Sequence, residues 1–235
     1  MIIEALYPEV CNLYGDLSNI RYLARSCGAE IVNTSLKETP RFVTEDPALV
    51  YMGTTTERGQ ELVRDAFAPH LEALRRRTEN GGVTLITGNA LEIFGEYIQD
   101  DGGNRIPMLG LFPTHAVRRM MNRYNSLYLG EFEGMKIVGF KSQFGHSWGD
   151  VGQGLFNTLR GPGLNPDVKP EGIRINNLMA TYVIGPLTVL NPPFAKYLLG
   201  LMGVEEPVLA FEDAALDAYN TRVTEFSDPK RGLTY

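Results

Sequence analysis

The sequence predicts an α/β protein with an open, mostly parallel β-sheet and helices on both faces. Short apolar runs at residues 2–7, 48–52 and 83–87 have the length and composition of strands buried on both sides. Segments with apolar residues at helical spacing alternate with these runs. This alternation is typical of parallel sheets joined by helices. The 235 residues, 43% of them hydrophobic, are enough for one large domain with a sizeable core.

The first half of the chain supplies the elements of that sheet. Asp16 or Ser18 is expected to cap the first helix, and Gly28 to end it in a left-handed conformation. Strands are expected, in order, at residues 2–7, 30–34, 48–52 and 83–87. A long helix is expected over residues 57–77 and a further helix over residues 90–98.

The second half is less regular. Short β-like runs are expected at residues 108–112, 126–132 and 136–140, and a hairpin over residues 173–184. Residues 145–170 are rich in Gly, Pro and Asn, which favours a long surface loop. Helices are expected at residues 193–202 and 212–225. We interpret residues 1–235 as one domain, with a core over about 1–203 and a helical extension over about 204–235.

Composition narrows the classes of function. The net charge of −6 argues against a general nucleic-acid binder, which usually has a basic face. No apolar run approaches the roughly 20 residues that span a bilayer. The two cysteines, Cys11 and Cys27, form no CxxC pair and are expected to be small buried thiols, so the sequence indicates neither a zinc site nor a disulfide framework. We therefore expect a cytoplasmic protein without metal or cofactor.

Residues 83–95 carry the strongest functional signal. A buried strand, a tight turn and a helix form a nucleophile elbow, which lifts one side chain above the end of a sheet. The predicted turn consists of Thr87, Gly88 and Asn89, so neither Cys nor Ser stands there. The segment thus has the architecture of covalent catalysis without the expected nucleophile.

Five segments in order extend this observation. They are Tyr7-Pro8-Glu9 with residues 12–16 and Asn19, residues 53–58, residues 86–95, Gly139-Phe140, and residues 181–187 with Asn191-Pro192. Together they resemble the class I (triad-type) glutamine amidotransferases of the cobyric-acid-synthase-like (CobB/CobQ-like) branch. Within that branch they are most similar to the glutaminase subunits (GatD) of lipid II isoglutaminyl synthases. The resemblance covers about residues 1–203 and implies a flavodoxin-like three-layer sandwich.

The resemblance also assigns roles to positions. The family uses a Cys thiolate as nucleophile, a His as general base and backbone N–H groups to hold the oxyanion. These roles would place the nucleophile at Gly88 and the base at Ile184, while the Glu and His of the middle motif become Lys141 and Gln143. Loss of one triad member costs about 10⁴-fold or more in rate. The resemblance therefore implies that the chain does not hydrolyse glutamine by the family mechanism.

A non-catalytic subunit is the function that these substitutions favour. By resemblance, it would bind or scaffold a Mur-ligase-like or cobyric-acid-type ATP-dependent synthase. A small molecule in the vestigial glutamine pocket is a further expectation. Candidate contacts for that molecule are Gly53, Thr54, Asn89, Lys141, Gln143 and His146.

Two alternatives remain open. The first is an active amidotransferase or hydrolase whose chemistry has moved to His146, Ser147 or Lys141; the simpler interpretation of His146 is a polar loop residue beside Trp148. The second is an ordinary glutaminase with a different alignment, which the lack of any Cys after residue 27 opposes. His70 and His115 are expected to be surface or capping residues, and Asp100-Asp101 to lie in a solvated acidic loop.

Overall fold

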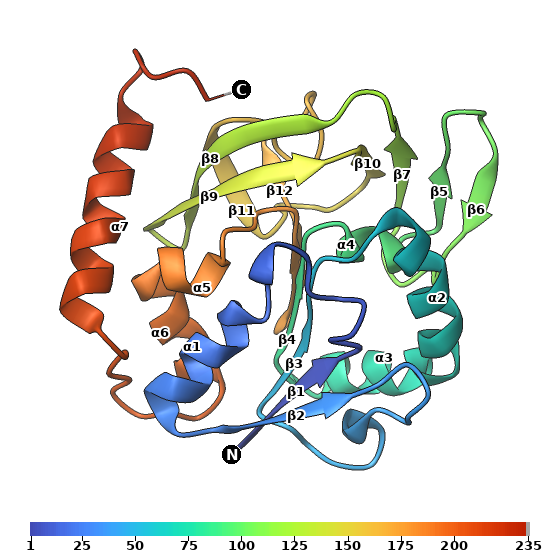
Figure 1. Ribbon diagram of the computed structural model, residues 1–235, viewed down its shortest axis with the longest axis horizontal. Helices are drawn as coiled ribbons and strands as arrows, with labels where there is room; N and C mark the ends of the chain where they lie inside the picture. Colours follow the sequence, from blue (N-terminus) through green and yellow to red (C-terminus); the bar gives the residue numbers. More distant parts are fainter. Residues whose placement is uncertain (234–235) are drawn as a thin grey trace.

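A central six-stranded sheet organises the protein (Figure 1). The computed structural model describes residues 1–233. The strand order is β13-β14-β4-β3-β1-β2, and every neighbouring pair is parallel except β13 with β14. The strands are β1 (Ile2–Leu6), β2 (Glu30–Thr34), β3 (Leu49–Met52), β4 (Thr84–Thr87), β13 (Ile173–Ile175) and β14 (Leu178–Thr181). The predicted parallel sheet is confirmed.

Helices cover both faces of this sheet (Figure 1). On one side lie α1 (Ser18–Cys27), α5 (Leu187–Leu190) and α6 (Pro192–Leu201), whose side chains Ile20 and Leu198 belong to one apolar cluster. On the other side lie α2 (Glu57–Phe67) and α3 (Leu71–Glu79), with Val63 and Leu74 in a second cluster. The α/β fold with helices on both faces is therefore confirmed.

Two further four-stranded sheets lie beyond the carboxyl end of the central sheet, in the upper part of Figure 1. One has the order β10-β7-β5-β6 and the other β12-β11-β8-β9. Their strands are β5 (Tyr97–Gln99), β6 (Arg105–Pro107), β7 (Thr114–Arg118), β8 (Tyr124–Phe132), β9 (Met135–Gln143), β10 (Gly145–Gly149), β11 (Phe156–Arg160) and β12 (Pro170–Glu171). The C-terminal helix α7 (Glu212–Ser227) packs on β8 and β9 through Tyr219 and Phe226.

Several predicted elements need correction. The helix expected over residues 57–77 is interrupted by a 3-10 turn, Ala68–His70, because Pro69 has no backbone N–H to continue the helical bonding. The helix expected over residues 90–98 is only the single turn α4 (Ala90–Ile93). It stops before Gly95, where an added Cβ would lie 2.7 Å from the Thr114 carbonyl oxygen, so the backbone packs directly against β7.

The second half was predicted with mixed success. Strands β8 and β9, the hairpin of β13 and β14, and helices α6 and α7 confirm the expectations for their segments. Residues 108–112 form no strand; the N–H groups of Leu111 and Phe112 both donate to the Phe94 carbonyl instead. The long surface loop expected over residues 145–170 is partly wrong, since this segment contains the strands β10 and β11.

Two details concern helix ends and membranes. Gly28 ends α1 with φ of 69°, as predicted, but α1 has Leu17 at its N-cap and no side-chain cap, so Asp16 and Ser18 do not cap it. Within residues 1–233, no helix combines the length and apolar character needed to cross a membrane.

Candidate functional site

The turn after β4 has the geometry of an elbow. All four residues of β4 are buried, and the single-turn helix α4 starts just after the turn. Gly88 lies at the bend with φ of +64°, and its N–H donates to the Thr181 carbonyl at 2.8 Å. This backbone conformation favours glycine because it has no Cβ. The strand–turn–helix prediction for this segment is confirmed.

The space above Gly88 is occupied by Thr54. A Cβ added at Gly88 would lie 2.1 Å from Thr54 Oγ1 and 2.8 Å from Thr54 Cγ2. Atoms cannot approach that closely, so a side chain at position 88 requires Thr54 to move. Thr54 belongs to the turn after β3, within residues 53–58, one of the five segments that carry the resemblance.

Asp16 holds Thr54 in this position. Its Oδ2 accepts hydrogen bonds from Thr54 N at 2.8 Å, Thr54 Oγ1 at 2.6 Å and Thr87 Oγ1 at 2.7 Å. Asp16 is fully buried, and a buried carboxylate needs such donors to offset its lost hydration. Asp16, Thr54, Thr87 and Gly88 are hereafter called the elbow cluster.

Tyr51 and Asn19 close the polar network beneath the elbow. The Tyr51 hydroxyl donates to the Asp16 carbonyl oxygen at 2.9 Å and lies 2.8 Å from Thr87 Oγ1. Asn19 Nδ2 donates to the Tyr51 hydroxyl at 3.0 Å and to Asp16 Oδ1 at 3.2 Å. Burial and the nearby Asp16 charge raise the pKa of Tyr51 well above its usual value. Tyr51 therefore acts here as a neutral hydrogen-bonding group.

Ile184, the position that the resemblance assigns to the general base, is buried and apolar. Its backbone N–H donates to the Phe140 carbonyl at 2.9 Å, and its carbonyl accepts from Phe140 N at 3.1 Å. A Cβ at Gly139 would lie 2.5 Å from Val183 Cγ1, so these two segments pack closely. The Ile184 side chain has no group that can bind or release a proton.

Lys141 forms a fully buried ion pair. Its Nζ lies 3.2 Å from Glu171 Oε1 and donates to the Gly163 carbonyl at 2.7 Å. Glu171 also accepts from Thr181 Oγ1 at 2.6 Å and from Tyr182 N at 2.9 Å. Burial lowers the pKa of Lys141, and the Glu171 charge opposes that shift. Both charges are thus held by internal partners.

Gln143 and His146 meet where β9 leads into β10. Gln143 Nε2 donates to the Gly145 carbonyl at 2.6 Å and lies 3.2 Å from His146 Nδ1. Gln143 Oε1 is buried and has no hydrogen-bond partner among the described residues. Burial, helped by the charge of Lys141, lowers the pKa of His146 to about 4, so its imidazole is neutral at pH 7.

Ser147 belongs to a different network from His146. The Ser147 hydroxyl lies 2.7 Å from the Tyr182 hydroxyl, which donates to Glu92 Oε1 at 2.9 Å. Neighbouring residues of a strand point to opposite faces, and on β10 Ser147 is buried while His146 is partly exposed. Burial raises the pKa of Glu92, and the hydrogen bonds from Gln60 and Tyr182 offset part of this rise.

The predicted site residues fall into two groups. Gly53, Thr54 and Asn89 lie around the elbow, where Asn89 Oδ1 accepts from Thr55 N at 3.0 Å and a Cβ on Gly53 would lie 2.6 Å from the Cys11 carbonyl oxygen. Lys141, Gln143 and His146 form the other group, on β9 and β10. Gln60 of α2 bonds to the elbow and to α4, since its Nε2 donates to the Asn89 carbonyl at 2.7 Å and to Glu92 Oε2 at 2.8 Å.

Sequence reasoning missed the acidic residues that organise these groups. The sequence predicts Asp16 only as a candidate helix cap and assigns no role to Glu92 or Glu171. Glu92 had a signal, because it is the one acid within an otherwise apolar elbow helix, Ala90–Ile93, whose members are all buried. Asp16 and Glu171 had no comparable signal, since each lies in a polar stretch of sequence.

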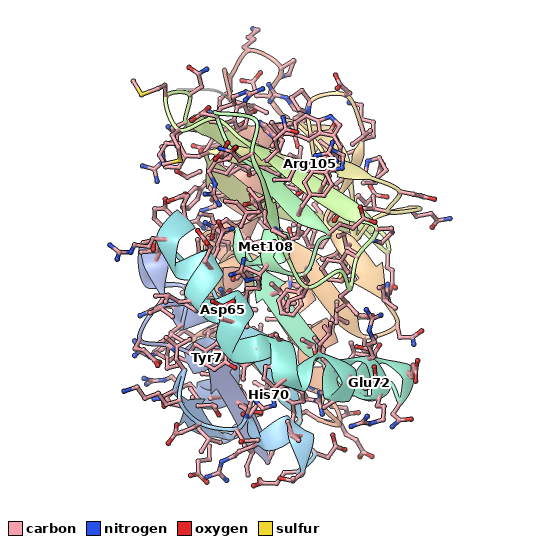
Figure 2. All side chains as sticks on the ribbon, turned by 90° about the vertical axis from the view of Figure 1, so that its right-hand side faces the viewer. Tyr7, Asp65, His70, Glu72, Arg105 and Met108 are labelled. Carbon is pink, nitrogen blue, oxygen red and sulfur yellow. The ribbon has the colours of Figure 1, made fainter. Side chains whose placement is uncertain are left out.

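The remaining candidates take structural positions. Cys11 is buried with its pKa raised to about 12 by burial, whereas Cys27 is only partly buried, so that expectation was wrong for Cys27. His115 stacks between Tyr97 and Trp148, with ring centroids 4.8 and 6.4 Å away. In Figure 2, His70 lies near the junction of α2 and α3, on the same side of the molecule as Asp65 and Glu72. Over residues 1–233, no three His, Cys, Asp or Glu side chains gather as a metal site.

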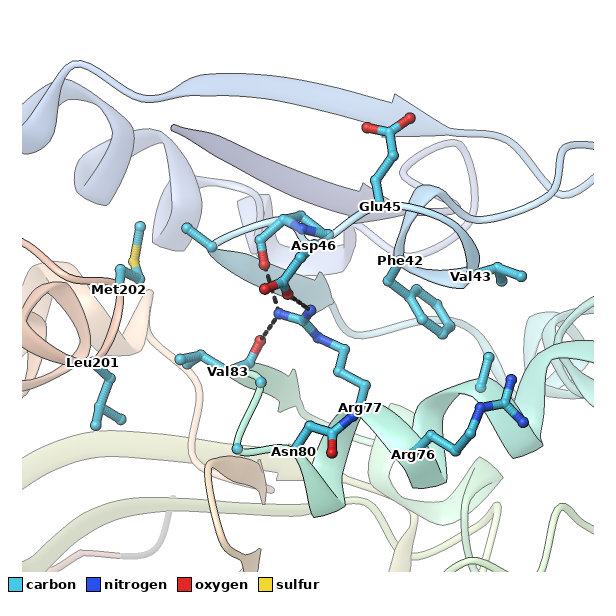
Figure 3. A pocket seen from close by; sticks show the side chains of 15 residues that line it. Phe42, Val43, Glu45, Asp46, Arg76, Arg77, Asn80, Val83, Leu201 and Met202 are labelled. Carbon is cyan, nitrogen blue, oxygen red and sulfur yellow. Dashed lines mark hydrogen bonds and ion pairs between the residues drawn. The ribbon is translucent and has the colours of Figure 1, made fainter.

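A cavity of about 540 Å³ lies at the opposite end of the sheet from the elbow (Figure 3). It is lined by Ala48 and Val83, which precede β3 and β4. Arg77 crosses it and donates to Asp46 Oδ1 at 2.7 Å and to the Pro47 carbonyl at 2.6 Å. These contacts tie the end of α3 to the loop before β3, so Arg77 has internal partners at this end of the sheet.

The family of the chain follows from its sequence match. Residues 2–190 match the profile of the CobB/CobQ-like glutamine amidotransferase domain. The chain belongs to this family. Amidotransferase-family relatives include the lipid II isoglutaminyl synthase (glutamine-hydrolyzing) subunit GatD of Staphylococcus aureus, 26% identical over 92% of this chain and 90% of that protein. The subunit of the same name from Streptococcus pneumoniae is 24% identical over 84% and 78%.

Solved structures of amidotransferases share the fold. The structure of PurLQS from Thermotoga maritima superposes with a TM-score of 0.58 and 12% identity, covering 86% of this chain and 96% of that one. At that identity the likeness establishes the architecture alone. It agrees with the three-layer arrangement described above.

Proposed function

We propose that the protein is a subunit of an ATP-dependent, Mur-ligase-like synthase in cell-wall precursor amidation and that it does not itself hydrolyse glutamine. Support for the pathway comes from the two relatives, both named as subunits of lipid II isoglutaminyl synthase. Support for the lack of glutaminase activity comes from the residues at the elbow.

The single observation that carries the proposal is the position of Thr54. A thiol at position 88 would need the volume that Thr54 now occupies, since the Cβ alone would lie 2.1 Å from Thr54 Oγ1. Thr54 is in turn bonded to the buried carboxylate of Asp16 through both its N–H and its hydroxyl. The elbow is therefore stabilised in a form that leaves no room for a nucleophile.

The position assigned to the base supports the same conclusion. Ile184 cannot accept the proton that a thiol or hydroxyl must lose. Loss of one triad member typically lowers the rate by about 10⁴-fold or more, and a second loss adds little. A chain with neither group is expected to leave glutamine unchanged.

Internal hydrogen bonds oppose a small-molecule ligand at the elbow. Thr54, Lys141 and Gln143 are all buried, and the first two have their polar atoms bonded internally. His146 is the candidate most open to solvent, and Gln143 Oε1 beside it is the acceptor without a partner. A ligand, if present, would contact these two residues rather than the elbow.

Relocated chemistry at His146 and Ser147 is the alternative that the test must separate. Its support is that His146 is partly exposed and has a neutral imidazole at pH 7. Against it, Ser147 points to the other face of β10 and bonds to Tyr182 instead. A general base must lie within hydrogen-bond reach of the proton it takes.

The test is a glutaminase assay with the purified chain, alone and with its copurified synthase. The GatD subunit of Staphylococcus aureus serves as the active comparison. We expect ammonia and glutamate to stay at the protein-free background in both conditions. Turnover above background contradicts the proposal, and turnover that is lost in both His146→Ala and Ser147→Ala establishes the alternative.

A further inference from the structure

We propose that Tyr14, Met120, Met121 and Arg123 form the docking surface for the synthase partner and that they fit an apolar socket bordered by carboxylates. This inference rests on the proposed function, because it takes the synthase as the occupant. The four residues are hereafter called the Met–Arg patch. They come from the loop after β1 and from the connection between β7 and β8, and that connection lies at the top of Figure 1.

The apolar side chains of the patch are unusually open to solvent. Met121 is 92% exposed, Met120 43% and Tyr14 46%. Single exposed apolar residues are normal on a protein surface, but here two are adjacent and the third is joined to their loop by Arg123. Methionine, tyrosine and arginine are residue types enriched at protein interfaces.

The loop that carries the methionines is held by hydrogen bonds. Arg119 N donates to the Phe144 carbonyl at 2.7 Å, and Asn122 N donates back to the Arg119 carbonyl at 3.0 Å. Met120 N donates to Asp101 Oδ2 at 2.8 Å. The backbone is therefore fixed while the Met121 side chain projects into solvent, so docking would cost little ordering of the loop.

Arg123 joins the loop to the elbow side of the molecule. Its guanidinium donates to the Tyr14 hydroxyl and lies over the Phe144 ring, 5.0 Å from the centroid. Leu13, next to Tyr14, donates its N–H to the Thr54 carbonyl at 3.0 Å. The patch is thus continuous, through Tyr14 and Leu13, with the turn that packs on Gly88. A partner bound here would sit over the same edge of the sheet as the elbow.

Charge defines the chemistry of the partner. The whole chain has a net charge of −6, yet the patch contributes Arg123 and is flanked by the exposed Arg119. Asp101 lies 4.0 Å from Arg119 and offsets part of its charge, which leaves Arg123 as the main cation. A basic, apolar spot attracts a carboxylate-rimmed surface, whereas two copies paired symmetrically through this patch would bring Arg123 against Arg123 and carry a net charge of −6 each.

The experiment measures binding of purified synthase, identified by copurification from the native cell, to variants of the full chain. Met121→Asp and Arg123→Glu should each weaken the complex by at least about tenfold, as truncations at interface hot spots do. Leu62→Asp on α2, where the side chain is 53% exposed, and Arg21→Glu on α1 are the matched controls and should bind like wild type. Unchanged thermal melting of each variant shows that the fold is intact.

The outcomes separate the two proposals. A complex that forms but ignores both patch substitutions overturns the docking surface and leaves the subunit role standing. A complex weakened equally by Leu62→Asp or Arg21→Glu also overturns it, because the effect is then not local. Copurification of no ATP-dependent synthase overturns the proposed function, and the docking surface with it. We expect the affinity of the wild-type chain for the synthase to fall as the salt concentration rises, because salt screens the charged contact. This salt dependence should be smaller for Arg123→Glu.

Discussion

The elbow cluster and the Lys141–Glu171 pair both bury charge, but they neutralise it in different ways. At the elbow, one carboxylate, Asp16, is held by neutral donors from Thr54 and Thr87. On β9, Lys141 forms an ion pair with Glu171, and neither side chain is exposed to solvent. The first arrangement can lose a donor and keep the others, whereas the second leaves an uncompensated charge when either partner is removed.

The difference bears on how this amidotransferase fold is stabilised at its elbow and on β9. The backbone of the elbow keeps its bend at Gly88 because β4 and α4 are fixed by the buried core. Above the bend, Thr54 fills the space over Gly88 and Asp16 fixes Thr54. On β9, Lys141 pairs with Glu171 of β12. Both regions are thus stabilised by internal contacts.

Breaking the ion pair should have the largest effect. Lys141→Met leaves Glu171 buried without its cation and should lower the free energy of unfolding by about 3–5 kcal/mol. Urea unfolding followed by circular dichroism measures it. Lys141→Met combined with Glu171→Gln removes both charges and should recover at least half of the loss. A double variant as unstable as the single one would show that packing around Lys141, not its charge, is what matters.

A side chain at the elbow should have the next largest effect. Gly88→Cys places a Cβ against Thr54 Oγ1 and imposes φ of +64° on a non-glycine residue, which should cost about 2–4 kcal/mol of stability. Thr54→Gly removes the clash but not the backbone strain, so Gly88→Cys should cost less stability in a Thr54→Gly background than in wild type. The urea concentrations at the unfolding midpoints measure both effects, provided that the m-values of the variants are equal. A Gly88→Cys protein as stable as wild type would contradict the packing described for the elbow.

His146 should give a smaller, pH-dependent effect. Its pKa is lowered to about 4 in the folded protein, against about 6.5 when exposed, so between these values the unfolded chain binds more protons. Stability should therefore fall as the pH drops from 6.5 to 4. After allowance for partial exposure, wild type should lose about 1–3 kcal/mol more than His146→Gln over that range. Lys141, Glu92 and the other facing groups titrate in both proteins and cancel in the difference. If the free energies of unfolding of the two proteins change in parallel with pH, the lowered pKa described for His146 is contradicted.

The sequence predicted the backbone of the site better than its side-chain contacts. Periodicity and turn residues located β3, β4 and the bend at Gly88, because these depend on local pattern and on a buried sheet. The contact between Thr54 and Gly88, and the role of Asp16 in fixing it, join residues 34 to 71 positions apart, and no local pattern encodes such a contact. The two upper sheets were only partly predicted for the same reason, since β5, β7 and β10 are short and find partners far along the chain.

The smallest effect should come from the same turn as Thr54 but outside the elbow cluster. Thr56 caps α2, where its hydroxyl accepts from Gly59 N at 3.0 Å. Thr56→Ala should cost about 1 kcal/mol, the usual loss for a helix cap, and lower the melting temperature by about 2–4 °C. Thr54→Ala, two residues earlier, removes a hydroxyl bonded to a buried carboxylate and should cost more. If calorimetry ranks the two variants the other way, the stability of this turn resides in the start of α2, and Asp16 is not what holds the turn against Gly88.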